Sequence, residues 1–244
     1  MRRYGLIGYP LTHSFSKRYF TRKFEEEGIS GCAYELFQLS SIQELKSILA
    51  EYPDLAGFNI TIPYKKEVLA FLDRSEIPEG LDACNCVRID NGQLTGFNTD
   101  VTGFEQSLVP LLAPHHTKAL VLGNGGAAES VSFVLKKLGI ETEVVSRRLH
   151  KGSTCTYTDL TVDSIRKHQL IINTTPLGTY PETEQYPDIP YEGITSSHLL
   201  YDLVYNPPVT RFLQKGQEQG AAIKNGEEML VIQAEESWKI WNRD

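Results

Sequence analysis

The sequence predicts an α/β protein of two domains. Short apolar runs alternate with longer amphipathic segments through most of the 244 residues, which is the pattern of strands joined by helices. Asn91-Gly92, a strong two-residue hairpin signal, joins two alternating segments in the N-terminal part of the chain. A hairpin requires antiparallel strands, so we expect a mixed sheet in the first domain. A glycine-rich turn near the middle of the chain organises the second domain.

That turn follows a short apolar strand, Ala119–Leu122, and comprises Gly123, Asn124, Gly125, Gly126, Ala127 and Ala128. It fits the G-x-G-x-x-G/A pattern of a dinucleotide-binding turn. Gly123 permits the tight turn, Gly125 lets the backbone approach a pyrophosphate, and Ala128 allows close packing of helix on strand. The helix that follows presents unpaired N–H groups to phosphates. A plain βαβ turn is the alternative, but strand, turn, helix and strand in this order favour a Rossmann-type domain.

The end of the second strand selects the nucleotide. NAD sites usually place an acidic residue there, which binds the ribose 2′-hydroxyl. Here the strand Glu141–Val145 ends in Ser146, Arg147 and Arg148, without a carboxylate. Two guanidinium groups suit a 2′-phosphate through bidentate hydrogen bonds, whereas the alternative is a pair of solvated arginines. The sequence therefore favours NADP over NAD.

Composition excludes several classes of protein. The chain is 41% hydrophobic with a formal net charge of -7, and has no basic tail, so we expect no nucleic-acid binding. No apolar run is long enough for a signal peptide or a membrane span. Cys32, Cys84, Cys86 and Cys155 form no CxxC pair, and the histidines are scattered. We therefore expect no metal site, and reduced thiols in a cytoplasmic protein.

In the first domain, apolar and alternating runs predict strands at Arg2–Ile7, Ala33–Gln38, Leu55–Ile62, Ala83–Ile89 and Gln93–Phe97. Helical spacing and capping residues predict helices at Lys17–Glu27, from Ser40 or Ser41 to about Glu51, and from Pro63 to about Leu72. Ser16 is the expected N-cap of the first helix. Pro63 is well placed as the first residue of the third.

A helix from Asp100 to about Leu112 leads into the second domain, and Pro110 should end or kink it. Strands are then expected at Ala119–Leu122, Glu141–Val145, Leu170–Ile172, Leu199–Leu203 and Ala221–Ile223. The expected helices run from the glycine turn to Gly139 and over Val162–Lys167, Val209–Gln219 and Glu227–Trp241. We expect domains at 1–101 and 102–225, with 226–244 returning to complete the first.

Two charged residues stand in unusual places. Lys65 would lie in the first turn after Pro63, where the helix dipole opposes a cation and would lower the pKa of a catalytic lysine. An exposed lysine in a first turn is equally common. Asp100 opens a helix, and locally an N-cap is its more ordinary role. A catalytic role requires the two side chains to meet.

Several polar and glycine-containing segments stand out along the chain: Gly8–Ser16, Asn59–Lys65, Asn85, Asn98–Asp100, Asn173–Gly178, Tyr201–Pro207 and Asn225–Ala234. In this order they resemble the motifs of the shikimate dehydrogenase family, over nearly the whole length of the chain. This resemblance implies NADPH-dependent, reversible reduction of 3-dehydroshikimate to shikimate in aromatic amino-acid biosynthesis. A quinate/shikimate dehydrogenase with relaxed substrate or cofactor choice, and a catalytically silent NADP-binding sensor, are the alternatives. Intact Lys65 and Asp100 count against the sensor.

The resemblance also implies roles for individual residues. Ser14 and Ser16 would hold the substrate carboxylate with help from Tyr205. The ring hydroxyls would be bound by Thr61, Asn85 and Gln233, and Lys65 and Asp100 would lie at the carbonyl. We expect only this small-molecule partner, no nucleic acid or membrane, and a monomer or homodimer.

On the cofactor side, the resemblance implies binding by the glycine turn and Ser146–Arg148, with Leu203 and the backbone at Glu228 near the nicotinamide. Two departures stand out. The family commonly has Asn-Arg-Thr where this chain has Ser146-Arg147-Arg148, and often has glycine in place of Glu228. A glutamate there would repel phosphate if it pointed inward.

Overall fold

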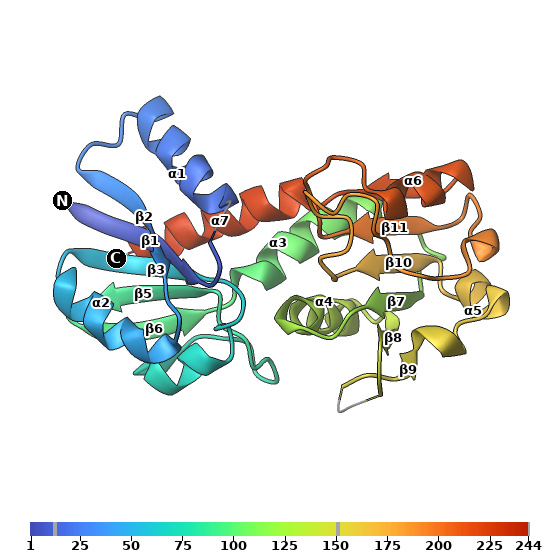
Figure 1. Cartoon of the computed structure of the whole chain (residues 1–244), viewed down its shortest axis with the longest axis horizontal. Coiled ribbons are helices and arrows are strands. Elements are labelled where there is room, and N and C mark those ends of the chain that lie inside the picture. The colour runs from blue at the N-terminus through green and yellow to red at the C-terminus, as the bar shows by residue number, and fades with distance from the viewer. Residues whose placement is uncertain (12–13, 150–151, 244) are drawn as a thin grey trace. The chain divides into compact units, whose positions relative to one another are not determined.

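The computed structural model describes residues 1–11, 14–149 and 152–243, so Thr12 and His13 of the Gly8–Ser16 motif lie outside the described residues. The chain forms two compact units, Met1–Thr102 with Val231–Asp244, and Gly103–Leu230 (Figure 1). The expected limits of the first domain were residues 101 and 226. In the structure the second limit falls inside the last helix, after Leu230.

The first unit contains a six-stranded mixed sheet in the order β2-β1-β3-β5-β6-β4. The strands are β1 (Arg2–Gly8), β2 (Cys32–Gln38), β3 (Leu55–Ile60), β4 (Arg74–Ser75), β5 (Cys86–Asp90) and β6 (Gln93–Phe97). Strands β1, β2 and β3 are parallel, and β5 is antiparallel to both β3 and β6. Asn91 (φ 50°) and Gly92 (φ 77°) close the β5–β6 hairpin, as their sequence predicts.

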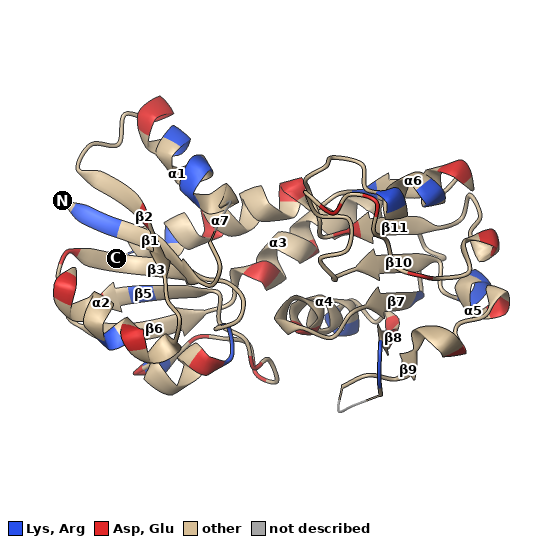
Figure 2. Ribbon diagram, in the orientation of Figure 1, with Lys and Arg blue, Asp and Glu red and all other residues tan. Residues whose placement is uncertain are grey.

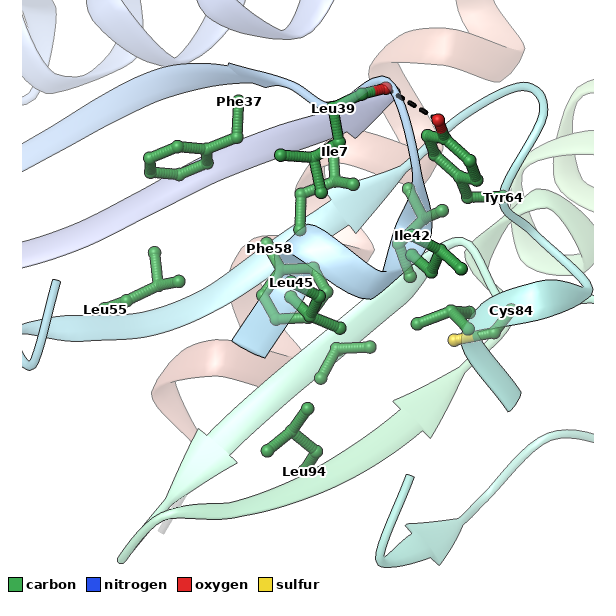
Figure 3. Close-up of a cluster of buried hydrophobic side chains, with 13 residues drawn as sticks. Ile7, Phe37, Leu39, Ile42, Leu45, Leu55, Phe58, Tyr64, Cys84 and Leu94 are labelled. Carbon is green, nitrogen blue, oxygen red and sulfur yellow. Dashed lines mark hydrogen bonds between the residues drawn. The ribbon is translucent and has the colours of Figure 1, made fainter. Parts of the chain in front are cut away.

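Helices cover both faces of this sheet. The face with Ile7, Phe58 and Val87 packs on α2 (Leu45–Glu51) and the 3₁₀ helices Ile42–Glu44 and Glu67–Phe71, and forms the cluster in Figure 3. The opposite face packs on α1 (Phe15–Glu26) and the end of α7 (Glu227–Asn242). Trp241 lies 4.8 Å from the Tyr4 ring, and its Nε1 donates to Val87 O at 3.0 Å. These contacts place the C-terminal segment in the first unit.

The expected cap of α1 is wrong. The helix begins at Phe15, and Ser14 rather than Ser16 is its N-cap. Ser14 has the extended backbone that a cap requires (φ -114°, ψ 117°), and its Oγ accepts from Lys17 N at 3.1 Å. Ser16 therefore lies inside the first helical turn.

The expected α-helix after Pro63 is also wrong. Residues 62–66 form turns, and a 3₁₀ helix begins only at Glu67. The Lys65 carbonyl, which an α-helix would use internally, accepts from Cys84 N at 2.8 Å. Tyr64 anchors the turn in the core, where its hydroxyl donates to Leu39 O at 2.6 Å (Figure 3). Lys65 is thus fixed by tertiary contacts, and the helix-dipole argument does not apply to it.

The second unit contains a six-stranded, fully parallel sheet in the order β12-β11-β10-β7-β8-β9. The strands are β7 (Lys118–Leu122), β8 (Glu141–Ser146), β9 (Cys155–Thr156), β10 (Leu170–Asn173), β11 (Leu199–Asp202) and β12 (Ala222–Lys224). Numbered in chain order within the sheet, they lie 3-2-1-4-5-6, the Rossmann arrangement. In such sheets ligands bind at the carboxyl ends of the strands where the order reverses, here between β7 and β10.

Helices α3 (Thr99–Leu108), α4 (Gly126–Lys137), α5 (Val162–Lys167) and α6 (Arg211–Glu218) complete the fold. Pro110 lies in a 3₁₀ turn, Val109–Leu111, after α3 has ended. Helix α6 begins two positions later than expected because Thr210 caps it, accepting from Leu213 N at 3.3 Å. Across the described ranges, no helix combines the length and the apolar character needed to span a bilayer.

Candidate active site

The candidate substrate residues of the first unit lie at one edge of its sheet. Strands β1 and β3 are parallel, so the segments after them, with Ser14 and Thr61, leave the same edge. Strand β6 runs in the same direction and leads to Asp100. Strand β5 runs the opposite way, so Asn85, which precedes it, returns to that edge. The topology thus gathers residues distant in sequence.

Lys65 and Asp100 meet there. Lys65 Nζ donates to Asp100 Oδ2 at 2.6 Å, and the two side chains are only 16% and 10% exposed. Asp100 is not the N-cap, because α3 begins at Thr99 and Asn98 Oδ1 accepts from Val101 N at 3.2 Å. Its carboxylate is therefore available to orient the lysine, and it lies in the first helical turn, where negative charge is favourable.

The buried side-chain amide of Asn85 binds the second oxygen of the Asp100 carboxylate. Asn85 Nδ2 donates to Asp100 Oδ1 at 2.9 Å, while Asn85 Oδ1 accepts from Thr99 N at 2.6 Å. These bonds determine which way the amide faces. Thr99 Oγ1 then lies 3.4 Å from Gln233 Oε1. Asn85, Gln233 and the Lys65–Asp100 pair consequently belong to one hydrogen-bonded network.

The network extends to α1. Thr99 Oγ1 lies 3.4 Å from Ser237 Oγ, which accepts from Asn59 Nδ2 at 2.9 Å. Asn59 Oδ1 accepts from Tyr34 OH at 2.9 Å, and the Ser16 side chain hydrogen-bonds to Tyr34. Burial raises the pKa of Tyr34 well above its usual value, so this phenol stays neutral. A continuous buried path joins Ser16 to Lys65.

Tyr34 and Ser237 are not among the site residues that the sequence predicts. Ser237 follows Gln233 by four residues on α7, a spacing that places both on the same helix face and could have identified it. Tyr34 is a buried residue of the partly exposed strand β2, at the edge of the sheet, and carries no such signal.

The glycine turn has the expected backbone. Gly123 has φ +109°, and a Cβ there would lie 2.7 Å from Thr174 Oγ1. Thr174 follows β10, and both its N and its Oγ1 donate to Leu122 O, at 2.9 and 2.8 Å. Gly125 caps α4, and a Cβ on it would meet no described atom within 4 Å. The N-terminus of α4 is therefore open to a ligand where the strand order reverses.

Two cations follow β8. Ser146 is buried, and its Oγ donates to Arg148 O at 2.7 Å, which shapes the turn after the strand. Arg147 and Arg148 are exposed, and the segment leaving β8 is blue in Figure 2. Burial raises the pKa of Tyr157 to about 12, and the positive charge of Arg147 opposes that shift, so the guanidinium lies near this ring.

The last two cofactor-binding candidates, Leu203 and Glu228, lie near a close backbone contact at Gly226. Leu203 follows β11, and its N donates to Asn173 O at 2.9 Å. A Cβ on Gly226 would lie 2.1 Å from Leu203 O, so only glycine fits there. Glu228 is 51% exposed, and its carboxylate is ion-paired with Lys224. This pairing offsets the charge that the sequence places near the cofactor.

We expect Gly226→Ala to destabilise the protein by about 1–3 kcal/mol, the usual cost of overpacking, and to weaken dinucleotide binding. The added methyl would displace the Leu203 carbonyl, which is main chain and cannot rotate away. Thermal unfolding and dinucleotide titration would measure both effects. Gly216→Ala is the matched control, because the three atoms nearest its methyl would all belong to the Leu200 side chain, which can rotate. Equal effects of the two variants would contradict the prediction.

These features define a dinucleotide-dependent oxidoreductase of two α/β units. One unit has a Rossmann sheet, a glycine turn and two arginines directly after β8. The other carries the Lys65–Asp100 pair. A family model for the shikimate dehydrogenase substrate binding domain matches residues 6–87. The chain belongs to the shikimate dehydrogenase family, because relatives more than 30% identical match it over nearly its whole length.

A shikimate dehydrogenase (NADP(+)) of Methanococcus maripaludis is 37% identical, with 97% of this chain and 90% of the relative covered. Another from Caldanaerobacter subterraneus is 34% identical, with 98% and 90% covered. Among solved structures, shikimate 5-dehydrogenase from Thermus thermophilus in complex with NADP(H) and shikimate has a TM-score of 0.86 at 31% identity. That match covers 99% of this chain and 94% of the other.

Proposed function

We propose that this protein is an NADP-dependent shikimate dehydrogenase, which reversibly reduces 3-dehydroshikimate to shikimate. The observation that carries the proposal is the largely buried Lys65–Asp100 ion pair, linked by Asn85 and Thr99 to Gln233. The relatives from Methanococcus maripaludis and Caldanaerobacter subterraneus are both named shikimate dehydrogenase (NADP(+)), which supports the substrate and the cofactor.

NADPH, when bound, supplies the hydride that adds to the ketone carbon. The carbonyl oxygen then becomes an alkoxide, which needs a proton donor within hydrogen-bond reach. Lys65 Nζ donates that proton and, before transfer, its positive charge stabilises the developing negative charge. Asp100 orients the ammonium group through the 2.6 Å contact and accepts from the neighbouring substrate hydroxyl. Solvent returns a proton to the lysine after each reduction.

The proposed substrate contacts follow from the hydroxyl chemistry at the sheet edge. Ser14 Oγ already accepts from Lys17 N, which leaves its O–H free to donate to a carboxylate. Ser16 lies in the first turn of α1, where the helix dipole favours an anion. In this proposal Tyr205, from the segment after β11, adds a third hydroxyl. Thr61, Asn85 and Gln233 bind the ring hydroxyls.

On the cofactor side, we propose that Gly123–Ala128 and the N-terminus of α4 hold the pyrophosphate. Ser146, Arg147 and Arg148 would form the site of the 2′-phosphate, and Leu203 and the Glu228 backbone would contact the nicotinamide. The first unit would thus bind substrate and the second NADP. The four cysteines are free thiols, which fits the reducing cytoplasm. We also propose a monomer or homodimer without nucleic-acid or membrane partners.

Steady-state rates with shikimate and quinate, each with NADP and NAD, test the proposal. We expect the highest kcat/KM for shikimate with NADP. Comparable values for quinate would indicate relaxed substrate choice, and a higher value with NAD would refute the cofactor assignment. Binding of NADPH with no turnover of either acid would indicate a silent sensor.

A further inference from the structure

Asp202 is a buried carboxylate that the proposed chemistry leaves without a role. It ends β11, is completely buried, and has no cationic partner among the residues that the structure describes. Burial raises its pKa to about 6, although hydrogen bonds from Thr210, Val204 and Asn173 favour the charged form. A buried charge is costly unless hydrogen bonds compensate it. The position of these donors indicates what the carboxylate does.

Its three donors come from three different segments. Asn173 Nδ2, at the end of β10, donates to Oδ1 at 2.9 Å. Val204 N, two residues beyond Asp202, donates to the same oxygen at 3.0 Å. Thr210 Oγ1, the cap of α6, donates to Oδ2 at 2.5 Å. One carboxylate therefore ties together the ends of β10 and β11 and the start of α6.

Two of these donor residues, Asn173 and Val204, also hydrogen-bond to a further segment of the chain. Because Asn173 presents Nδ2 to Asp202, its Oδ1 faces the next segment and accepts from Thr175 N at 3.0 Å and Thr175 Oγ1 at 2.6 Å. Val204 O accepts from Gly226 N at 3.2 Å, just before α7. The carboxylate thus determines the course of the segments after β10 and β11.

Those segments lie beside the glycine turn. Thr174, between Asn173 and Thr175, has its Oγ1 only 2.7 Å from the Cβ position of Gly123. Leu203, between Asp202 and Val204, is the residue whose carbonyl lies against Gly226. We propose that Asp202 is a positioning residue that holds the dinucleotide-facing segments after β10 and β11 in their binding geometry. This inference rests on the proposed function, because it presupposes a dinucleotide at this edge.

A carboxylate suits this position better than an amide does. The Asn173 and Val204 groups can only donate, and an ionised carboxylate only accepts. A protonated Asp202 would carry one hydrogen, for which only the Thr210 hydroxyl could act as acceptor. The charge of Asp202 also acts on Tyr191 in the 3₁₀ turn Tyr191–Gly193, and burial raises the pKa of this tyrosine so that it stays neutral.

The test compares Asp202→Ala, Asp202→Asn and, as matched control, Thr161→Val, which removes the cap of α5 without touching Asp202. We expect Asp202→Ala to raise the Kd for NADPH at least about tenfold, since small displacements of positioning groups have large effects. The KM for shikimate should rise less, because Tyr205 is the one proposed substrate residue in the segment after β11 and the others lie in the first unit. Thr161→Val should lower Tm through loss of the α5 cap while leaving the Kd for NADPH nearly unchanged.

The pH dependence separates positioning from simple structural support. Between pH 7 and 5.5, the wild-type Kd for NADPH should rise more steeply than that of Asp202→Asn, because the ligand phosphates are common to both and only Asp202 differs. Parallel profiles, or wild-type affinity in a destabilised Asp202→Ala, would overturn the inference. Should Asp202→Ala not fold, the Asp202→Asn profile decides. A wild type that neither binds NADPH nor oxidises shikimate would instead refute the proposed function.

Discussion

Lys65→Ala is expected to lower kcat for shikimate oxidation by about 10²–10⁴, the usual contribution of a positioned acid or base. The variant lacks the ammonium group that lies 2.6 Å from Asp100 and that we place at the reacting carbonyl. Its Kd for NADPH should stay near the wild-type value, because Lys65 belongs to the first unit and the glycine turn to the second. Steady-state kinetics and fluorescence titration of NADPH would measure the two quantities.

Lys66→Ala provides the control, because it removes the same charge from the adjacent, exposed position. It should keep nearly full activity. Unchanged turnover in Lys65→Ala would exclude the lysine from the mechanism. A loss of NADPH affinity equal to the loss of turnover would show that the substitution disturbs more than the proton donor.

The Rossmann half of the fold could be predicted because its signals are local. An apolar strand, a glycine turn, an amphipathic helix and a second strand all lie within one continuous stretch, and Gly123 has the positive φ that only glycine adopts readily. The Asn91-Gly92 hairpin is local in the same way. Strands β4 and β9 could not be predicted, since two residues are too few to show alternation.

In the first unit, the predicted local structure is wrong where tertiary contacts, rather than local propensity, determine the backbone. Pro63 and its neighbours have the composition of a helix start, but the hydrogen bond from Cys84 N to Lys65 O replaces an intrahelical bond. At α1, Ser14 and Ser16 are both good caps by type, and the chain uses the first. N-cap propensity depends on residue type, so it cannot distinguish two serines.

The meeting of Lys65 and Asp100 depends on strand order rather than on local sequence. The two residues are 35 positions apart, and they meet because β5 and β6 fold back beside β3 and return the chain to the same sheet edge. The resemblance to a family could suggest the pair, whereas spacing alone could not. The Thr99 backbone fixes the Asn85 amide and the amide fixes the Asp100 carboxylate, which explains why a residue that the sequence suggests as an ordinary cap serves another purpose.

Arg147→Ala is expected to reduce the preference for NADP over NAD, as the ratio of kcat/KM values, by about 10–100-fold. A charge-assisted hydrogen bond to an ionised group contributes roughly 1.5–3 kcal/mol. The substitution removes this contribution from NADP, whereas NAD has no 2′-phosphate and never had it. The chain has no carboxylate directly after β8 that would favour the 2′-hydroxyl instead. Kinetics with both cofactors at constant ionic strength would measure the ratio.

Two further variants separate a specific contact from a change in overall charge. Arg166→Ala removes an exposed guanidinium that lies 3.7 Å from Asp163 in α5, and it should leave the ratio unchanged. Arg148→Ala should have a smaller effect than Arg147→Ala if the second arginine mainly adds long-range attraction, and adding salt should shrink that effect first. Equal losses with NADP and NAD in Arg147→Ala would assign its guanidinium to a part that both cofactors share, such as the pyrophosphate, and would leave the preference for NADP without a physical cause at the end of β8.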